Sequence, residues 1–492
     1  MRQIYAAART VLVAIDGLES HTEILSRALN LVSPTVSVAN QSREVHELLD
    51  GDDVQSSLAS FCQNRYWSRV WIVQEFAIGA RIEFLIGSAA IEASRMQLVL
   101  NILESRRQPI QWSQADAIFD IRREWQMSRP LFLLDALNHL RFSKCGKRHD
   151  RVFGLLGLST DAMKYVIEPD YTSTLDELNI SITQLYIERS TLDIILVAPH
   201  RNLSTSFELP SWCPDFFRFD IYPPRQDIID SVSGNRIWMA TSNATSDISI
   251  HANTLSSLSL RVGSICSLGM AWSDPPNSGF PMVDTHWARR SKRSTIRTSI
   301  FNCIQFILQK RYVFSPNHRM ASFERNSRSY SWLRVFLASH ESLRESEIPQ
   351  KSLARWVCGN RKFFAGGQYL QDHAASLWPP WTPGCLCVVN PNYLFGFDEG
   401  WPFGELEKAA NQDMRLMCLD DNSYGIGWAT NGARLHDEVF LVPGCSTPVI
   451  LRRVTHNQYR LTGHAIIAKD QVMNGKLWEK TKIENLTEIN II

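Results

Sequence analysis

The run TVLVAI at residues 10–15 constrains the fold most strongly, because it is short, apolar and rich in β-branched side chains. Such a run is typical of a buried strand in a parallel sheet. Residues 1–9 before it have the pattern of a helix end, and RIEFLIG at 81–87 predicts a second strand that Gly87 closes. A domain rarely begins in the last turns of a helix that feeds a central strand, so we expect further sequence upstream. The N-terminal part is therefore predicted to be α/β.

A chain of 492 residues exceeds what one core usually organises, so we expect two to four domains. Fifty-one basic and fifty acidic residues leave a net charge of +1, which gives no global attraction to nucleic acid or to an anionic membrane. The first residues are too polar for a signal peptide, and no stretch reaches the roughly 18 apolar residues of a membrane helix. Ten cysteines without a CxxC pair indicate a reducing compartment. We expect a soluble, cytoplasmic protein without a membrane span.

The sequence pattern changes three times along the chain. Residues 1–92 predict the α/β layer, and residues 93–220 are mainly helical in their apolar spacing. Residues 221–400 mix strand-like runs with a basic helical insert at 285–330, where a solvated helix face is favoured over a nucleic-acid site because stacking aromatics are scarce. Residues 401–492 contain short strands between Gly, Pro, Asn and Asp turns, which predict a small β-barrel or β-sandwich module.

Trp67, Trp71 and Glu75 stand at successive i+4 positions, which on one continuous helix would form a single ridge. The indoles would then shield the carboxylate from water and raise its pKa, which suits a group that holds a proton or steadies a developing cation. The same ridge would be structural if the tryptophans filled the core and the glutamate paired with an arginine. With fifteen tryptophans in the chain, roughly one Trp-x-x-x-Glu is expected by chance, so both interpretations stay open. The candidate arginine partners are Arg65, Arg69 and Arg81.

The well-marked catalytic motifs are absent: the chain has no P-loop, no GxGxxG after a strand, no HExxH and no GxSxG. Two other segments have structural explanations that outweigh catalytic ones. Asp150 and Arg151 in HDRVFGLLG are interpreted as a capping pair before a packed helix. Trp212 and Asp215 in LPSWCPDF are interpreted as a fixed turn around a buried indole.

A further helix is predicted after PDYTST, with Thr172 or Ser173 as its cap. Cys213 is interpreted as a core residue, because no histidine is placed to activate it as a nucleophile. No spacing of cysteine or histidine would let two turns hold zinc, so no metal is expected.

Four sequence blocks, taken in order, resemble one known family. They are MRQIYAAARTVLVAID; RYWSRVWIVQE; HDRVFGLLGLS with PDYTSTLDEL and LPSWCPDF; and DEVFLVPGCSTPVILRR with YRLTGHAIIAKDQVMNGKLWE. Together they are similar to fungal heterokaryon-incompatibility (HET) domain proteins over most of the chain, apart from residues 275–400. The positions that carry this likeness are Arg65, Trp67, Arg69, Trp71, Gln74, Glu75, Asp150, Arg151, Pro169, Asp170, Tyr171, Trp212, Pro214 and Asp215.

The sequence also departs from the family pattern. Blocks similar to the family's SYxWG and WIDxxCINQ are missing, so residues 1–92 would be a partial HET domain and 93–220 the helical region associated with it. Ala14 stands near the place where the family's strand usually has a tryptophan. These departures imply either a truncated gene model or a degenerate copy.

The HET domain has itself been likened to Toll/interleukin-1 receptor (TIR) domains, many of which cleave NAD at a helix glutamate within a Trp-x-x-x-Glu arrangement. The order of strand, helix and strand over residues 10–86 fits a partial TIR-like parallel sheet. The resemblance therefore implies Glu75 as a catalytic residue supported by Trp71, with NAD as a possible substrate and no required cofactor. The carboxylate would orient ribose hydroxyls or stabilise an oxocarbenium-like centre as nicotinamide leaves.

The resemblance implies a non-self recognition protein linked to programmed cell death, acting through self-association or protein partners. One alternative is an NAD glycohydrolase that uses Glu75. Another is a degenerate interaction protein without enzyme activity, which the missing blocks favour. Nucleic-acid binding through residues 285–330 is the least favoured, because the net charge is close to zero.

Overall fold

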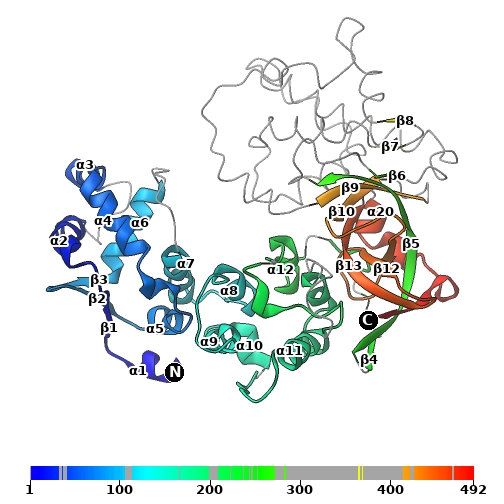
Figure 1. Cartoon of the computed structure of the whole chain (residues 1–492), viewed down its shortest axis with the longest axis horizontal. Coiled ribbons are helices and arrows are strands. Elements are labelled where there is room, and N and C mark those ends of the chain that lie inside the picture. Colours follow the sequence, from blue (N-terminus) through cyan, green and yellow to red (C-terminus); the bar gives the residue numbers. More distant parts are fainter. Residues whose placement is uncertain are drawn as a thin grey trace, which may run out of the picture. The chain divides into compact units, whose positions relative to one another are not determined.

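The computed structural model describes the chain in two compact units, whose elements are labelled in Figure 1. Unit 1 comprises Met1–Ile182 and Asp215–Pro223, and unit 2 comprises Thr183–Pro214 and Pro224–Ile492. The predicted basic insert at 285–330 lies outside the described residues. The described residues are 2–32, 36, 41–105, 114–165, 167–198, 209–221, 223–236, 238–242, 244, 248–251, 253–271, 282–283, 364–365, 368–369, 414–420, 426–467 and 470–492.

In the part of unit 1 that the structure describes, the sheet has three strands in the order β1, β2, β3. β1 (Val11–Ala14) runs parallel to β2 (Ile82–Ile86), and β3 (Ala89–Glu92) returns antiparallel to β2. Gly87 turns between β2 and β3 with a φ of +55°, a conformation that glycine adopts without strain. The two predicted strands are confirmed. The expectation of a central buried strand is wrong, because β1 lies at the edge of the described sheet with one face exposed.

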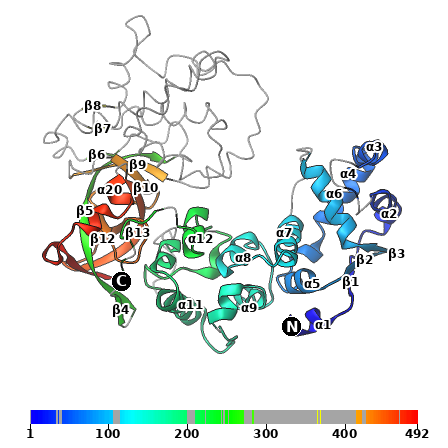
Figure 2. The same cartoon turned by 180° about the vertical axis from the view of Figure 1, so that it is seen from behind.

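Helices cover one face of this sheet and extend beyond it, as Figures 1 and 2 show from opposite sides. An aromatic cluster under the sheet joins α4, α5 and α7 to β2, with ring centroids 4.8–6.3 Å apart. Its rings are Phe61, Trp67, Phe76, Phe84 and Phe119. The helices are α1 (Arg2–Ala7), α2 (Thr22–Leu31), α3 (Arg43–Leu49), α4 (Asp52–Cys62), α5 (Ile72–Ile78), α6 (Ala93–Ser105), α7 (Gln114–Gln126), α8 (Leu133–His139), α9 (Asp150–Leu156) and α10 (Thr160–Tyr165).

Helix α11 (Leu175–Arg189) begins three residues after Thr172 and two after Ser173, the two predicted caps. Thr174 precedes it and accepts a hydrogen bond from the Glu177 backbone N–H at 3.2 Å through its hydroxyl, while the Glu177 carboxylate accepts from the Thr174 N–H at 2.8 Å. This reciprocal pair is a capping box. Thr172 and Ser173 instead donate their hydroxyls to Asp170 in the preceding loop, so the prediction that one of them caps the helix is wrong.

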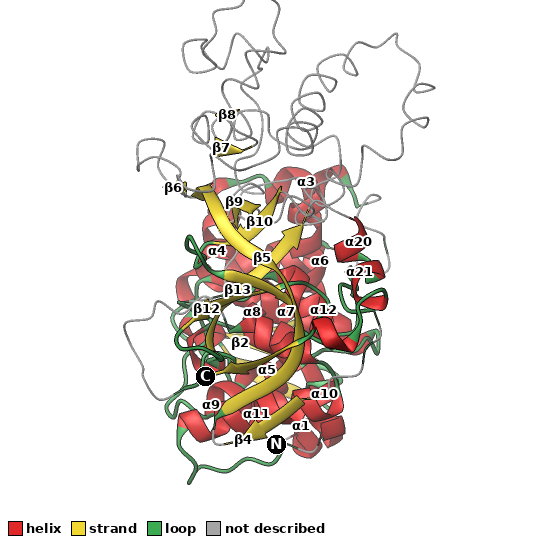
Figure 3. Cartoon of the chain, turned by 90° about the vertical axis from the view of Figure 1, so that its right-hand side faces the viewer, coloured by secondary structure: helices red, strands yellow, loops and turns green. Residues whose placement is uncertain are grey.

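Unit 2 is built on a mainly antiparallel sheet, in which β13 and β14 pair in parallel. Its longest strand, β5 (Thr254–Ala271), is drawn as a long curved strand in Figure 3. The strand order is β10, β9, β5, β11, β12, β13, β14, and β10 also pairs with β13 while β14 pairs with β5. β4 and β6 pair with β5, and β7 pairs with β8 in a separate ribbon. The remaining strands are β4 (Ile248–His251), β6 (Met282–Val283), β7 (Phe364–Ala365), β8 (Gln368–Tyr369), β9 (Met414–Leu419), β10 (Ile426–Thr430), β11 (Glu438–Leu441), β12 (Val449–Arg453), β13 (Gln458–Ile467) and β14 (Thr487–Ile491).

The other elements of unit 2 are the 3-10 helices η4 (Leu192–Val197) and η7 (Ile483–Asn485) and the α-helices α12 (Gln226–Val232), α20 (Asp470–Met473) and α21 (Lys476–Glu479). The predicted fold class is confirmed in its coarse form: a small sheet with a parallel pair, then helices, then an antiparallel sheet. The barrel or sandwich form and the boundaries of the four predicted domains stay predictions. Among the described residues, no helix has the length and apolar character to cross a bilayer.

Candidate functional site

The predicted ridge of Trp67, Trp71 and Glu75 is interrupted. Trp67 lies in the 3-10 helix η3 (Arg65–Ser68), after which Arg69 adopts an extended conformation and bridges to Lys144. Helix α5 starts only at Ile72, with Trp71 as its N-cap residue. A continuous helix through all three residues is therefore wrong, although Trp71 and Glu75 keep their i+4 relation because Trp71 has helical backbone angles (φ −68°, ψ −27°).

Trp67 is a core residue. Its indole is buried in the aromatic cluster of unit 1, and its Nε1–H donates to the Phe61 carbonyl at 2.8 Å. A buried tryptophan with a satisfied N–H is a packing anchor. The structural interpretation of the tryptophan pair thus holds for Trp67, whereas Trp71 is only half-buried.

Glu75 is half-buried on the first turn of α5 and faces polar side chains from two other segments. The Tyr5 hydroxyl on α1 hydrogen-bonds to its carboxylate. Burial raises the pKa of Tyr5, and the negative charge of Glu75 raises it further while Arg69 opposes the shift. Burial likewise raises the pKa of Tyr66, with Glu75 adding to the effect. We call Tyr5, Tyr66, Arg69 and Glu75 the Glu75 cluster.

The Glu75 cluster combines one carboxylate, two phenols and one guanidinium at the surface of unit 1. The Tyr66 hydroxyl is buried and finds no hydrogen-bond partner within the part of the chain that the structure describes. Arg69 is exposed and lies close enough to both tyrosines to lower their pKa values. A half-open carboxylate that one phenol orients can accept hydrogen bonds from a hydroxylated ligand or stabilise a cation. Neither Arg65 nor Arg81, the other predicted partners, pairs with Glu75: they pair with Asp16 and Glu83.

Gln74, beside Glu75, has a structural function. It is buried, and its Nε2–H donates to the Gly154 carbonyl in α9 at 2.8 Å. The segment just before α5 approaches α9 closely here, since a Cβ on Gly154 would lie 3.2 Å from Val70. This position of the family-like block therefore joins two helices and is not directed at a ligand.

Asp150 and Arg151 occupy the first turn of α9 without capping it, because His149 is the N-cap residue and makes no side-chain cap bond. Asp150 instead accepts a hydrogen bond from the Tyr171 hydroxyl at 2.6 Å, and burial together with this bond raises the pKa of Tyr171 to about 12. Arg151 donates to Asp220 and to the Phe217 carbonyl, both at 3.0 Å. The prediction that Asp150 and Arg151 cap the helix is therefore wrong. Their side chains instead bind residues of two loops, Tyr171 and Asp220.

The remaining predicted positions hold loops and turns. Asp170 is exposed, and hydroxyl and backbone donors from Ser173 and Thr172 lower its pKa to about 2. The exposed Pro169 precedes it.

The segment LPSWCPDF contains the other predicted positions. In unit 2, Trp212 is fully buried and its Nε1–H donates to the Asn253 carbonyl at 2.9 Å. Pro214 is also buried. In unit 1, Asp215 caps the 3-10 helix η5 (Phe216–Arg218) by accepting from the Phe217 N–H at 3.2 Å. The predicted fixed turn and the buried indole are confirmed.

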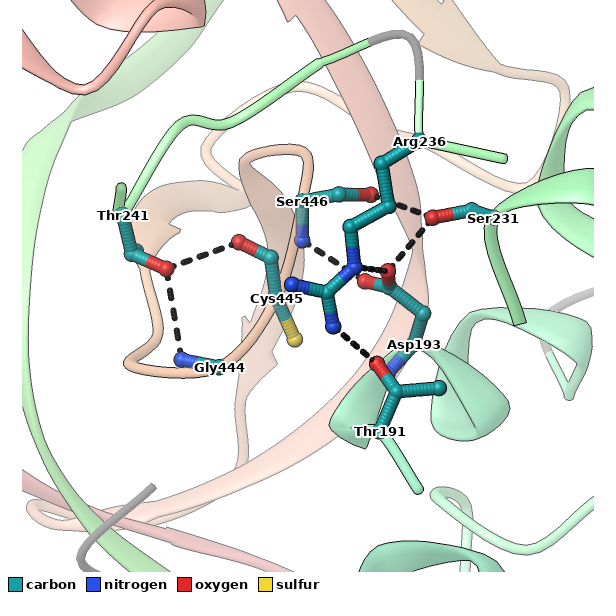
Figure 4. Close-up of polar contacts among 8 residues, drawn as sticks. All are labelled: Thr191, Asp193, Ser231, Arg236, Thr241, Gly444, Cys445 and Ser446. Carbon is teal, nitrogen blue, oxygen red and sulfur yellow. Dashed lines mark hydrogen bonds and ion pairs between the residues drawn. The ribbon is translucent and has the colours of Figure 1, made fainter. Parts of the chain in front are cut away.

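A second polar cluster, which the sequence interpretation missed, lies inside unit 2 (Figure 4). Its centre is Asp193 in η4, which is 0% exposed. One carboxylate oxygen accepts from the Ser231 hydroxyl at 2.5 Å and lies 3.3 Å from Arg236 Nε, while the other accepts from the Ser446 N–H at 2.6 Å. Arg236 also donates to the Thr191 hydroxyl oxygen, which accepts from the Asp193 N–H at 3.1 Å. We call these five residues the Asp193 cluster.

The Asp193 cluster joins three elements that are far apart in sequence: η4, the segment from α12 to Arg236, and the turn after β11. Thr241 extends it by donating to the Cys445 carbonyl at 2.9 Å and accepting from the Gly444 N–H at 3.2 Å. Burial raises the pKa of the Cys445 thiol, and the nearby Asp193 charge adds to this shift. Because the thiol is neutral and buried and the carboxylate is hydrogen-bonded on both oxygens, the Asp193 cluster is interpreted as stabilising the fold of unit 2. The sequence signal for this cluster is the apolar run LDIILV, which contains Asp193. Such a run predicts burial of the segment, but it does not show that the Asp193 carboxylate is buried with it.

Neither cluster has the composition of a metal centre. Over the described ranges, no group of three or more His, Cys, Asp or Glu side chains is arranged to hold a metal ion. Cys213 is buried, and its thiol contacts the Thr183 hydroxyl at 3.4 Å. The core interpretation of Cys213 agrees with this placement.

The N-terminal part of the chain is similar in sequence to a known protein family. Residues 1–75 match the family model described as Heterokaryon incompatibility protein (HET). The chain carries a HET domain segment. No curated protein and no solved structure matches the chain. The HET segment, residues 1–75, contains the whole Glu75 cluster, and Glu75 is its last residue. The Asp193 cluster and the predicted marker positions from Asp150 onward lie outside the match.

Proposed function

We propose that this chain is a heterokaryon-incompatibility protein that acts in non-self recognition linked to programmed cell death, through association with itself or with another protein. The observation that carries the proposal is the match of residues 1–75 to the HET family. The well-packed core around Trp67 supports it, because an ordered HET segment is a precondition for specific association. The proposal places the chain inside the cell, where the cysteines that the structure describes, none of which is in a disulfide, stay reduced.

The test is induced expression of the full chain in a filamentous fungus, with cell viability as the readout. Expression of the unaltered chain is expected to reduce viability. Trp67→Ala should abolish this effect because it removes the largest ring of the unit 1 core, whereas Arg27→Ala, on an exposed position of α2, should leave it unchanged. Unchanged viability at confirmed expression of the unaltered chain would refute the proposal.

A second candidate function is hydrolysis of NAD to ADP-ribose and nicotinamide with Glu75 as the catalytic carboxylate. The half-exposed position of Glu75 beside Tyr5 leaves its carboxylate open to a ligand, as this candidate requires. The carboxylate would accept ribose hydroxyls or stabilise the cationic ribose as the glycosidic bond breaks, and water would then add to the anomeric carbon. The TIR likeness that suggests NAD stays a prediction.

The purified chain can be incubated with NAD beside Glu75→Gln and Tyr5→Phe variants. If the second candidate holds, Glu75→Gln loses at least a hundredfold in rate, and Tyr5→Phe loses less, because it removes an orienting hydrogen bond only. Equal turnover by the unaltered chain and by Glu75→Gln would remove Glu75 from the mechanism. Absence of turnover together with retained cell death would favour a non-catalytic interaction protein.

A further inference from the structure

Two positive charges lie side by side next to the Glu75 cluster. The Lys144 N–H donates to the Ser68 carbonyl at 2.5 Å, and the Val70 N–H donates to the Lys144 carbonyl at 3.1 Å. This pattern is a parallel bridge in which Arg69 and Lys144 are the opposed residues. Opposed residues of a bridge direct their side chains to the same face of the backbone, so the two cations are neighbours. Both side chains are exposed.

The backbone register holds these two charges together at a cost. Like charges on directly opposed residues repel each other, so the arrangement is unfavourable until an anion lies between them. Other arginines of unit 1 pair with carboxylates, as Arg81 and Arg151 do at 2.7 and 3.0 Å. Among the residues that the structure describes, no carboxylate forms an ion pair with Arg69 or Lys144. The pair therefore has the form of an anion-binding site.

The cationic pair lies close to the Glu75 carboxylate without neutralising it. The charges of Arg69 and Glu75 shift the pKa values of Tyr5 and Tyr66 in opposite directions, so both charges act on both phenols at short range. In the described part of the chain, Arg69 and Glu75 form no ion pair with each other. The surface thus presents a cationic end and a carboxylate end that stay separate.

A ligand of this surface must complement both ends. A phosphate group fits the cationic end, because the arginine fork binds its oxygens bidentately and the lysine adds a point charge. The Glu75 carboxylate repels the same phosphate and accepts hydrogen bonds from hydroxyl groups instead. A sugar phosphate with free hydroxyls carries both features next to each other, as the ribose phosphate of a nucleotide does. Pyrophosphate lacks the sugar hydroxyls, and a nucleoside lacks the anionic group.

We propose that Arg69 and Lys144 bind a phosphate group of a nucleotide whose ribose hydroxyls reach Glu75. The proposal rests on the second candidate function, hydrolysis of NAD, and adds the residues that select its substrate class. In NAD the ribose that carries nicotinamide is joined directly to the diphosphate, so a phosphate held by the cationic pair orients this ribose against Glu75. The site then prefers nucleotides to nucleosides.

Calorimetric titration of the full chain with ADP-ribose tests this arrangement without requiring turnover. The unaltered chain is expected to bind ADP-ribose, and to bind adenosine and pyrophosphate at least about tenfold more weakly, because each of these satisfies one end only. Arg69→Gln and Lys144→Gln should each weaken ADP-ribose binding about tenfold, and Lys144→Arg, which keeps the charge, should weaken it less. The matched controls, Arg27→Gln on α2 and Lys164→Gln on α10, alter exposed residues and should bind like the unaltered chain.

Thermal unfolding without ligand gives a second and independent readout. Removal of one of two opposed like charges should leave the melting temperature unchanged or raise it, even though the same change weakens binding. A lower melting temperature for both Arg69→Gln and Lys144→Gln would show that these charges already pair with a carboxylate of the protein. That result would overturn the proposal.

The binding results separate this site from the enzymatic function. Absent binding of ADP-ribose, binding that either substitution leaves unchanged, or equally tight binding of pyrophosphate would overturn the nucleotide site. Hydrolysis of NAD that is lost in Glu75→Gln would, in those cases, leave the second candidate function standing. Binding that both substitutions weaken, without hydrolysis of NAD, would instead uphold the site and remove the enzymatic function.

Discussion

The Glu75 cluster and the Asp193 cluster each centre on one carboxylate next to an arginine, but they differ in how completely they are bonded. Asp193 is fully buried and receives hydrogen bonds from Ser231 and Ser446 as well as an ion pair from Arg236. Glu75 is half-exposed and receives the Tyr5 hydroxyl, while the neighbouring Tyr66 hydroxyl is buried without a partner that the structure describes.

This difference in hydrogen bonding predicts that one cluster stabilises the fold and that the other can bind a ligand. A buried charge is tolerated only when its hydrogen-bonding capacity is met, and a carboxylate in that state has no capacity left for a ligand. A half-open carboxylate retains acceptor sites and is less important for stability. The Asp193 cluster should therefore govern the folding of unit 2, and the Glu75 cluster should govern activity in unit 1.

The largest expected effect is that of Asp193→Ala. The change leaves the Ser446 N–H, the Ser231 hydroxyl and the Arg236 guanidinium without their acceptor, and it should lower the free energy of unfolding by about 3 kcal/mol. We take the low end of the usual range because Arg236 is 29% exposed and can turn toward water. Urea unfolding measures the loss. Glu484→Ala, which removes an exposed pair with Lys482, is the control and should cost less than about 0.5 kcal/mol.

Gln74→Leu should have the next largest effect. It removes the hydrogen bond to the buried Gly154 carbonyl and should destabilise unit 1 by about 1–2 kcal/mol. Gln63→Leu, on an exposed position after α4, is the matched control. Thermal unfolding of both variants distinguishes the helix-joining role of Gln74 from a ligand-directed one. An unchanged melting temperature together with lost activity would place Gln74 in the site.

Tyr66→Phe should be nearly neutral at pH 7, within about 1 kcal/mol, because its hydroxyl has no partner to lose among the described residues. Its effect should appear at alkaline pH. The pKa of folded Tyr66 is raised above the ordinary value of 10.0, so the folded state holds the proton that the unfolded state releases. The resulting stability is present below pH 10 and is lost as the pH rises above it. The free energy of unfolding, measured from pH 9 upward by denaturant titration, should fall less steeply with pH for Tyr66→Phe than for the unaltered chain.

The smallest expected effect on folding is that of Glu75→Gln. The amide oxygen can still accept from the Tyr5 hydroxyl, so stability should change by less than about 0.5 kcal/mol. A loss comparable to that of Asp193→Ala would abolish the distinction between the two clusters. The same protein sample serves for the NAD and viability assays.

The sequence predicted regular elements better than it predicted their termini. TVLVAI and RIEFLIG formed the expected strands because apolar, β-branched runs leave few alternatives. The helix through Trp67 and Glu75 failed, since Asn64 caps a 3-10 turn by accepting from the Tyr66 N–H, and Arg69 then pairs with Lys144, which is distant in sequence. Tertiary pairing of this kind leaves no periodic signal.

The site was predicted only in part. Glu75 was identified through spacing and family likeness, but Tyr5 and Tyr66 approach it from segments that no i+4 rule connects. Asp193 was not identified because an aspartate at the start of an apolar run is indistinguishable from a surface cap until Arg236 and Ser446 are brought beside it. Burial of charge is a property of the assembled core and not of any local pattern.

The position of β14 has a consequence for synthesis. This strand pairs with β5, although more than two hundred residues lie between them, and its Ile489 and Ile491 side chains are fully buried. A ribosome that adds 5–20 residues per second takes roughly 10–50 s to cover that interval. During this time the β5 edge that β14 will occupy has emerged while its partner does not yet exist. Nascent chains of this protein should therefore depend on chaperones until translation passes residue 491.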